Sequence, residues 1–172
     1  MSRLIFHDDD TRFTDEVRLR GLGEGEVMPA GHVSRQRGLP NLLLVLFHDP
    51  VEVVLKGERQ EVPEGTLALW DRNRPHWFGN AAQEWSHSWI VFDGVSWRGD
   101  SEGLKPYFER PIALGGDDHI GRYFRSLMRE FDAFAKPSLR IVAGNIDLLL
   151  HEISRGAASE AWQRLRQDPV ET

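Results

Sequence analysis

The chain has 172 residues, of which 40% are hydrophobic and 28% charged, so it is long enough to form one globular domain with a substantial core. Its formal net charge of −6 argues against nucleic-acid binding by its own surface, because phosphate binding needs a concentrated basic face. The absence of cysteine excludes disulfides and thiolate metal sites, and no apolar segment reaches the ~18–20 residues that span a bilayer. We expect a cytoplasmic protein with no membrane contact.

Residues 1 to about 115 predict a series of short strands. The apolar run NLLLVLF at 41–47 is typical of a buried strand, and VEVVL at 51–55 is β-branched and precedes a turn in which Gly57 is placed for a positive φ. Further strands are predicted at 66–71 and 87–94, and the segment 110–116 is expected to close the β region. Short strands with turn signals at roughly 8–12-residue intervals favour a sandwich or a small barrel.

The periodicity then changes to that of helices. Apolar residues in 120–134 follow the spacing i, i+3, i+4, i+7, which predicts an amphipathic helix with Asp117 or Asp118 as its N-cap. A second helix is predicted after Pro137, with Ser138 as its cap, and is expected to end at the Gly-Ala-Ala-Ser segment that begins at residue 156.

Two apolar residues of this second helix, Ile141 and Leu148, lie off its main hydrophobic stripe. Either the helix packs under both the β region and the first helix, or part of its surface forms a dimer seam. The sequence also contains six tryptophans, five of them between residues 70 and 97, a cluster that fits a core or a ligand pocket, with the core favoured for any single one.

The segment DRNRPHWFGN at 71–80 resembles the second signature of the cupins, G-x5-P-x-G-x2-H-x3-N. Gly65, His76 and Asn80 match this signature, whereas Asp71 and Asn73 replace its Pro and its second Gly.

A longer stretch, 35–94, resembles the sugar-sensing N-terminal region of the AraC-type transcription regulators. The resemblance depends on an arginine ahead of the apolar strand, on VPEGTLALW, on a turn at PHWFGN and on WSHSWIVFDG. It covers roughly residues 15–158, because the two helices resemble the pair through which such regulators form homodimers.

The resemblance implies a mainly β fold, a cupin barrel (double-stranded β-helix or jelly roll) followed by two C-terminal α-helices. We expect an effector-binding barrel over 1–115, a helical dimerisation hairpin over 116–158 and a linker over 159–172. The family's C-terminal helix-turn-helix half does not occur in this sequence. We therefore expect a sensor fragment in preference to a stand-alone relative, with DNA contacted only through that missing half.

The resemblance also implies a small-molecule effector, expected to be a monosaccharide. Sugars are recognised by planar donors such as arginine and by aromatic faces against their C–H side. His87 and Trp89, at i and i+2 of one strand, point to the same face, although ordinary core packing is the alternative for both. The expected ligand-binding residues are Arg35, Arg37, His76, Phe78, His87 and Trp89.

A catalytic metal is the main alternative. Metal-binding cupins hold the ion with three histidines and a glutamate, but here Arg35 and Arg37 fall where the H-x-H pair would be, and arginine cannot act as a ligand. That leaves His76, unless a different register recruits His32 or His48. We expect no metal, no cofactor and no enzymatic activity. The competing hypotheses are a stand-alone metal-dependent cupin enzyme, an isomerase or dioxygenase, and a barrel filled by side chains that serves only to dimerise.

Overall fold

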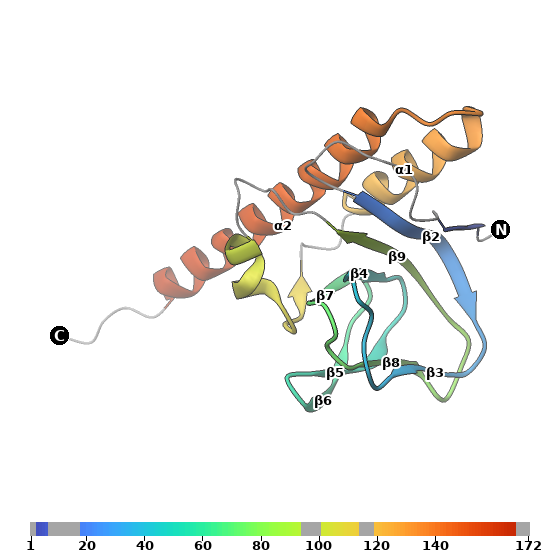
Figure 1. Ribbon diagram of the computed structural model, residues 1–172. Coiled ribbons are helices and arrows are strands. Elements are labelled where there is room, and N and C mark those ends of the chain that lie inside the picture. Colours follow the sequence, from blue (N-terminus) through green and yellow to red (C-terminus); the bar gives the residue numbers. More distant parts are fainter. Residues whose placement is uncertain (1–2, 7–17, 94–100, 114–118, 168–172) are drawn as a thin grey trace.

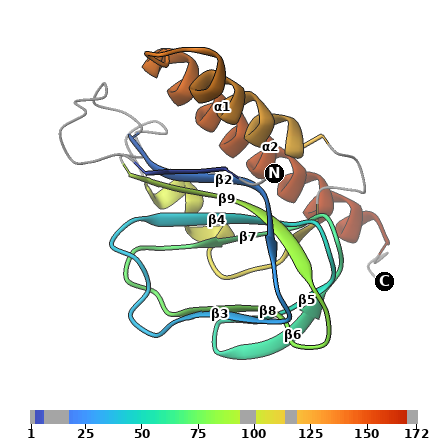
Figure 2. The same cartoon turned by 90° about the vertical axis from the view of Figure 1, so that its right-hand side faces the viewer.

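The computed structural model describes residues 3–6, 18–93, 101–113 and 119–167. Two antiparallel sheets face each other, and two helices cover the outer face of the larger sheet (Figures 1 and 2). This arrangement confirms the predicted fold class, a mainly β domain followed by two C-terminal helices.

The chain moves back and forth between the two sheets, so strands far apart in sequence become neighbours. In spatial order, the six-stranded sheet contains β1 (Arg3–Phe6), β2 (Arg18–Met28), β9 (Trp85–Asp93), β4 (Leu42–Phe47), β7 (Thr66–Trp70) and β10 (Ile112–Ala113). The four-stranded sheet contains β3 (Gly31–Arg35), β8 (His76–Asn80), β5 (Val51–Leu55) and β6 (Glu58–Val62). The helical elements are the 3-10 helix η1 (Ser101–Tyr107), α1 (Gly121–Ala133) and α2 (Leu139–Gln167).

Strand β4 is buried along its whole length because it lies between two cores. Leu43, Val45 and Phe47 belong to the core between the two sheets. The alternate residues Leu42, Leu44 and Leu46 belong to the core that the six-stranded sheet shares with the helices. A strand that is covered on both faces needs a continuous apolar run, so the buried strand predicted at 41–47 is confirmed.

The hairpin between β5 and β6 also follows the sequence. Lys56 and Gly57 both have positive φ angles, 53° and 80°, as the tight turns that fit the strand twist require. The predicted role of Gly57 is therefore confirmed.

The segment PHWFGN was predicted as a turn, and this is wrong, because residues from His76 to Asn80 form strand β8 between β3 and β5. Gly79 allows this pairing: its φ is 151°, and an added Cβ would lie 2.3 Å from the carbonyl oxygen of Gly31. The turn begins only at Asn80, whose side-chain oxygen accepts a hydrogen bond from the amide of Ala82 at 2.9 Å.

Helix α1 packs on the sheet through the predicted apolar stripe, of which Phe124 and Leu127 are completely buried. The residue before the helix is Ile120, which makes no side-chain capping bond. Asp117 and Asp118, predicted as caps, lie outside the described residues.

Helix α2 begins directly after Ser138, whose carbonyl accepts the amide hydrogen bond of Val142 at 3.0 Å. Its end was predicted wrongly: it continues through Gly156 to Gln167 and runs past the edge of the sandwich (Figure 1). A helical glycine costs only about 1 kcal/mol, and most residues in 157–167 are strong helix formers. The segment predicted as a linker is thus helical up to residue 167.

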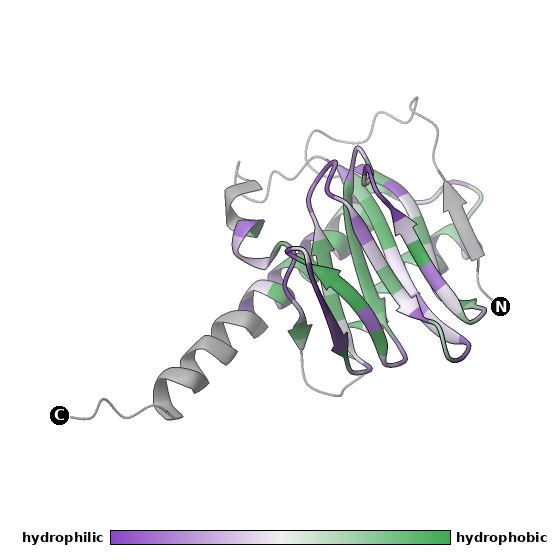
Figure 3. Ribbon diagram, turned by 90° about the horizontal axis from the view of Figure 1, so that it is seen from below, coloured by the Kyte–Doolittle hydropathy of each residue, from purple (hydrophilic) through white to green (hydrophobic). Residues whose placement is uncertain are grey.

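Figure 3 shows hydrophobic residues along the strands and hydrophilic residues gathered in the turns that join them. Within the described part of the chain, no helix combines the length and the apolar character needed to cross a membrane.

The close approach at Gly79 predicts an asymmetry between two glycine variants. Gly79→Ala should lower the free energy of unfolding by at least about 2 kcal/mol, because its Cβ would meet backbone atoms of β3 at an unfavourable φ. Gly144→Ala is the control, since nothing lies within 4 Å of its added Cβ, and it should stabilise α2 by about 0.5–1 kcal/mol. Urea unfolding measures both, and equal midpoints for Gly79→Ala and wild type would contradict the packing described.

Candidate ligand-binding site

A cavity of about 420 Å³ lies between the two sheets, within the ~300–1,000 Å³ range of small-molecule pockets. We call the end of the sandwich where β2, β4 and β8 begin and β3, β7 and β9 end the arginine end. Arg35 at this end both lines the cavity and is exposed, so the cavity reaches solvent there. Its walls are mostly apolar, and the polar side chains that line it are Arg20, Glu26, Arg35, Asn41, His76, His87 and Trp89. A cavity beside Trp89 argues against a barrel filled by side chains.

Five of the six residues predicted to bind a ligand line this cavity. Strand β8 supplies His76 and Phe78, β9 supplies His87 and Trp89, and Arg35 is the last residue of β3. Arg37 does not line it, because it follows the end of β3 in an exposed turn.

Side chains at every second position of a strand point to the same side of the sheet, so the cavity residues of each strand lie on its inner face. In the sheets, Arg35 pairs with His76, and Phe78 pairs with Val33, so all four side chains face inward. The ring centroids of His76 and His87 lie 6.0 and 5.9 Å from that of Phe78. The two imidazoles therefore flank one aromatic surface.

Trp89 is held by a bulge in β2. Gly23 lies opposite Trp89 and Glu26 opposite His87, so β2 has one residue more than β9 between these pairs. A Cβ on Gly23 would lie 2.3 Å from the indole nitrogen, so only glycine leaves room for this ring. The bulge also brings the carboxylate of Glu26 into the cavity, where it accepts the indole N–H of Trp89 at 2.6 Å.

Both histidines are buried deeply enough to favour the neutral imidazole. His76 and His87 are each only 4% exposed, and their Nδ1 atoms make no hydrogen bond to the residues that the structure describes. Burial lowers the pKa of His76, and it lowers the pKa of His87 from 6.5 to about 4, against the opposing effect of the Glu26 carboxylate. Glu26 lies 3.7 Å from the Nε2 of His87. At neutral pH these rings can exchange hydrogen bonds with a ligand without adding positive charge.

Asp93 organises the arginine end of the cavity. Its carboxylate accepts hydrogen bonds from Arg20 at 2.8 Å and from the side-chain amide of Asn41 at 2.6 Å. Arg72 approaches the second oxygen at 3.7 Å. One carboxylate thus ties β2, β4 and the segment after β7 together beside the opening.

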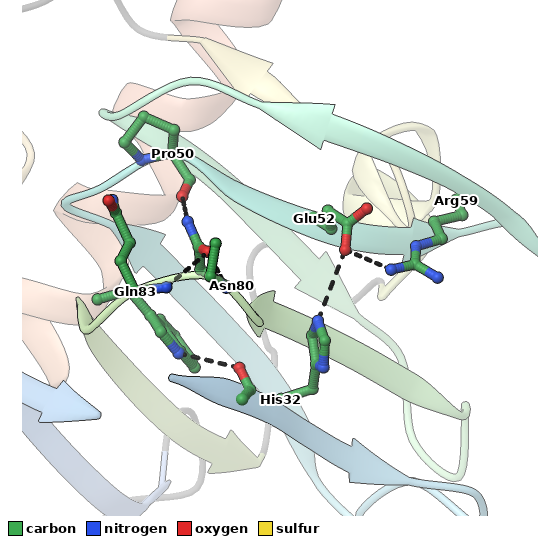
Figure 4. Close-up of polar contacts among 9 residues, drawn as sticks. His32, Pro50, Glu52, Arg59, Asn80 and Gln83 are labelled. Carbon is green, nitrogen blue, oxygen red and sulfur yellow. Dashed lines mark hydrogen bonds and ion pairs between the residues drawn. The ribbon is translucent and has the colours of Figure 1, made fainter. Parts of the chain in front are cut away.

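The two other histidines considered as metal ligands lie elsewhere. His32 is on the outer face of the four-stranded sheet, with its Nε2 3.6 Å from Glu52, which also pairs with Arg59 (Figure 4). His48 contacts the hydroxyl of Ser88 at 2.7 Å, and Ser88 points to the opposite face of β9 from His87. In the described ranges, no three His, Cys, Asp or Glu side chains are grouped so that they could share a metal ion.

Sequence reasoning missed Arg20 and Glu26 as cavity residues. Glu26 lies in GLGEGE, 21–26, a segment with three glycines within strand β2. A glycine-rich segment within a strand is a signal for a bulge or for a closely approaching side chain, and here it marks both.

No protein-family model and no curated protein matches this sequence. Among solved structures, the AraC-like transcriptional activator CuxR is similar in fold, with a TM-score of 0.55 and 12% identity. The alignment covers 90% of this chain and 61% of CuxR, so this chain spans about three fifths of that protein.

Two further structures are similar over a smaller share of this chain. The protein YhaK from Escherichia coli has a TM-score of 0.45 at 14% identity, over 67% of this chain and 52% of YhaK. A cupin domain of an XRE-family transcriptional regulator from Enterobacter cloacae has a TM-score of 0.37 at 13% identity, over 54% of this chain and 93% of that domain. The described part of the chain is a sandwich of two antiparallel sheets followed by two helices, and over 90% of the chain this fold is similar to that of CuxR.

The lowered pKa of His87 predicts that stability falls with acidification. The unfolded chain takes up a proton near pH 6.5 that the folded chain takes up only near pH 4, so stability is lost as the pH falls through this window. The contribution of His87 should decrease by about 2 kcal/mol between pH 7 and pH 5.

Urea unfolding at both pH values measures this loss. His87→Gln should remove most of it, whereas His151→Gln, on an exposed position of α2, should keep it. An unchanged pH dependence in His87→Gln would show that other groups cause the loss.

Proposed function

We propose that this chain is the effector-binding and dimerising domain of an AraC-type transcription regulator, with a monosaccharide as its effector. The observation that carries the proposal is the cavity, which combines an aromatic surface at Phe78 and Trp89 with the buried, unpartnered Nδ1 atoms of His76 and His87. Buried polar atoms without partners are costly, and sugar hydroxyls would satisfy them while the C–H face of the ring covers Phe78.

The regulator assignment is supported by the extent of the likeness to CuxR, which includes the helices as well as the sandwich. The net charge of −6 fits a domain that leaves DNA contact to a separate helix-turn-helix half. Ligand binding can regulate such a protein only if the ligand binds its two conformations with different affinities. The role proposed is therefore one of binding and signalling, without catalysis and without a metal or cofactor.

A homodimer through α2 is supported by its exposed apolar residues. Ile141 and Leu148 are 48% and 56% exposed and lie two helical turns apart on one face. The buried stripe that includes Ile146 and Leu149 faces the sheet instead. Because about half of each of these two side chains is exposed, we propose that Ile141 and Leu148 lie in a seam between two copies.

Thermal melts against pentoses, hexoses and sugar acids, each with and without a chelator, test the effector proposal. A ligand at 100 times its Kd should add about 2.7 kcal/mol, or roughly 5–10 °C in Tm. Trp89→Leu should abolish the shift, whereas Trp77→Leu, on the outer face of the four-stranded sheet, should keep it. No shift with any sugar, together with a lower Tm in chelator, would favour the metal-dependent enzyme.

Sedimentation equilibrium tests the dimer. Wild type should be dimeric, and Leu148→Arg should be monomeric with unchanged circular dichroism, because a charge in the seam would be desolvated. Val27→Arg, at a comparably exposed apolar residue of β2, is the control and should remain dimeric. A dimer that survives Leu148→Arg would place the interface elsewhere.

A further inference from the structure

We propose that the effector carries a negative charge, as a sugar acid or a sugar phosphate, and that Arg35 binds its anionic group at the opening of the cavity. This inference rests on the proposed function, in which the cavity takes a monosaccharide. It adds the chemical class of that sugar and the orientation in which it binds.

The first argument is the charge distribution. The protein has a net charge of −6, yet arginines gather where the cavity opens. Those on the described segments that form the arginine end are Arg18, Arg20, Arg35, Arg37, Arg72 and Arg74. Of the residues that the structure describes there, Asp71, Asp93 and Glu109 are acidic, so the described part of this end carries more arginines than carboxylates. A local excess of arginine side chains attracts anions and raises their rate of association.

The second argument is that three of these arginines are already paired with carboxylates, whereas Arg35, which lines the cavity, is not. Arg20 and Arg72 share Asp93, at 2.8 and 3.7 Å, and Arg74 pairs with Glu109 at 3.5 Å. Arg35 lines the cavity, its side chain is exposed, and it makes no ion pair or side-chain hydrogen bond with any residue that the structure describes. Its guanidinium can therefore present two parallel N–H donors to a carboxylate or phosphate.

The third argument is the polarity of the cavity. Glu26 places a negative charge beside His87, and it is engaged by the indole N–H of Trp89. A ligand anion would be repelled from this inner region and attracted to Arg35. The neutral imidazoles of His76 and His87 suit uncharged hydroxyls. An acidic sugar would thus enter with its hydroxyls toward β9 and its anionic group toward the opening.

The fourth argument is that the position of Arg35 is fixed by backbone contacts. Gly38, with a φ of 66°, donates its amide to the carbonyl of Arg35 at 3.1 Å, and an added Cβ there would lie 2.3 Å from the carbonyl oxygen of Arg74. The amide of Asn73 donates to the carbonyl of Leu39 at 2.6 Å. The turn after β3 and the loop before β8 are therefore locked together, so the base of the Arg35 side chain is preorganised for a ligand.

Calorimetric titration with matched ligands tests the inference. The probes are D-glucose, D-glucuronate and D-glucose 6-phosphate, with the three corresponding D-galactose compounds. Wild type should bind an anionic member at least about tenfold more tightly than its neutral parent, as expected for hydrogen bonds to a charged group. The comparison between glucuronate and 6-phosphate shows whether the anion is a carboxylate or a phosphate.

Two arginine variants identify the residue responsible. Arg35→Gln should reduce the preference for the anionic sugar to within about twofold, and should leave the Tm of the free protein unchanged because the side chain has no partner to lose. Arg37→Gln, two residues away and outside the cavity, should retain the wild-type preference.

The outcomes separate this inference from the proposed function. Equal binding of neutral and anionic sugars by wild type would overturn the anionic effector and leave a neutral-sugar sensor standing. Equal losses in the two arginine variants would overturn the role of Arg35 and leave the proposed function standing. Failure of every sugar in this titration and in the thermal-melt panel would overturn both.

Discussion

The six-stranded sheet is covered on both faces, and the rest of the structure depends on this constraint. Its central strands, β9 and β4, direct one set of side chains toward the helices and the alternate set toward the four-stranded sheet. Burying two such layers removes enough apolar surface from water to hold the sandwich closed. The four-stranded sheet can therefore leave part of its inner face open, and the cavity lies where His76 and Phe78 replace aliphatic packing.

The polar groups inside the cavity are either kept neutral or bonded to another side chain. A cluster of ionised groups in a buried space would destabilise the fold, but here burial keeps His87 neutral, and the carboxylate of Glu26 is satisfied by the indole of Trp89. The bulge in β2 makes this arrangement possible, because Gly23 leaves room for the indole and the extra residue turns Glu26 inward. Charge is otherwise confined to the opening, where Asp93 pairs with arginines that would repel one another.

The helices connect the sandwich to a second surface. Helix α2 contacts β2 and β10 through its buried stripe and leaves Ile141 and Leu148 on the opposite side. In the proposed regulator, a ligand that bridges β8 and β9 would be linked to α2 through the shared core that contains Ile90 and Phe92. Such coupling would require two arrangements of the helices that bind the ligand with different affinities.

The sequence by itself determined the features that depend on local periodicity. The apolar run at 41–47, the hairpin at Gly57, the two helices and the shared face of His87 and Trp89 all follow from repeats of 2 or 3.6 residues. Only the tertiary structure showed which of Arg35 and Arg37 lines the cavity. Strand β3 ends at Arg35, and Arg37 lies outside the cavity in the turn that follows. The tertiary structure alone placed Glu26 in the cavity, since a bulge changes the register that alternation would give. It also showed that 76–80 is a strand: Gly79 resembles a turn residue in sequence, but its glycine-specific φ serves close contact with a neighbouring strand, and such a contact is a property of the assembled sheet.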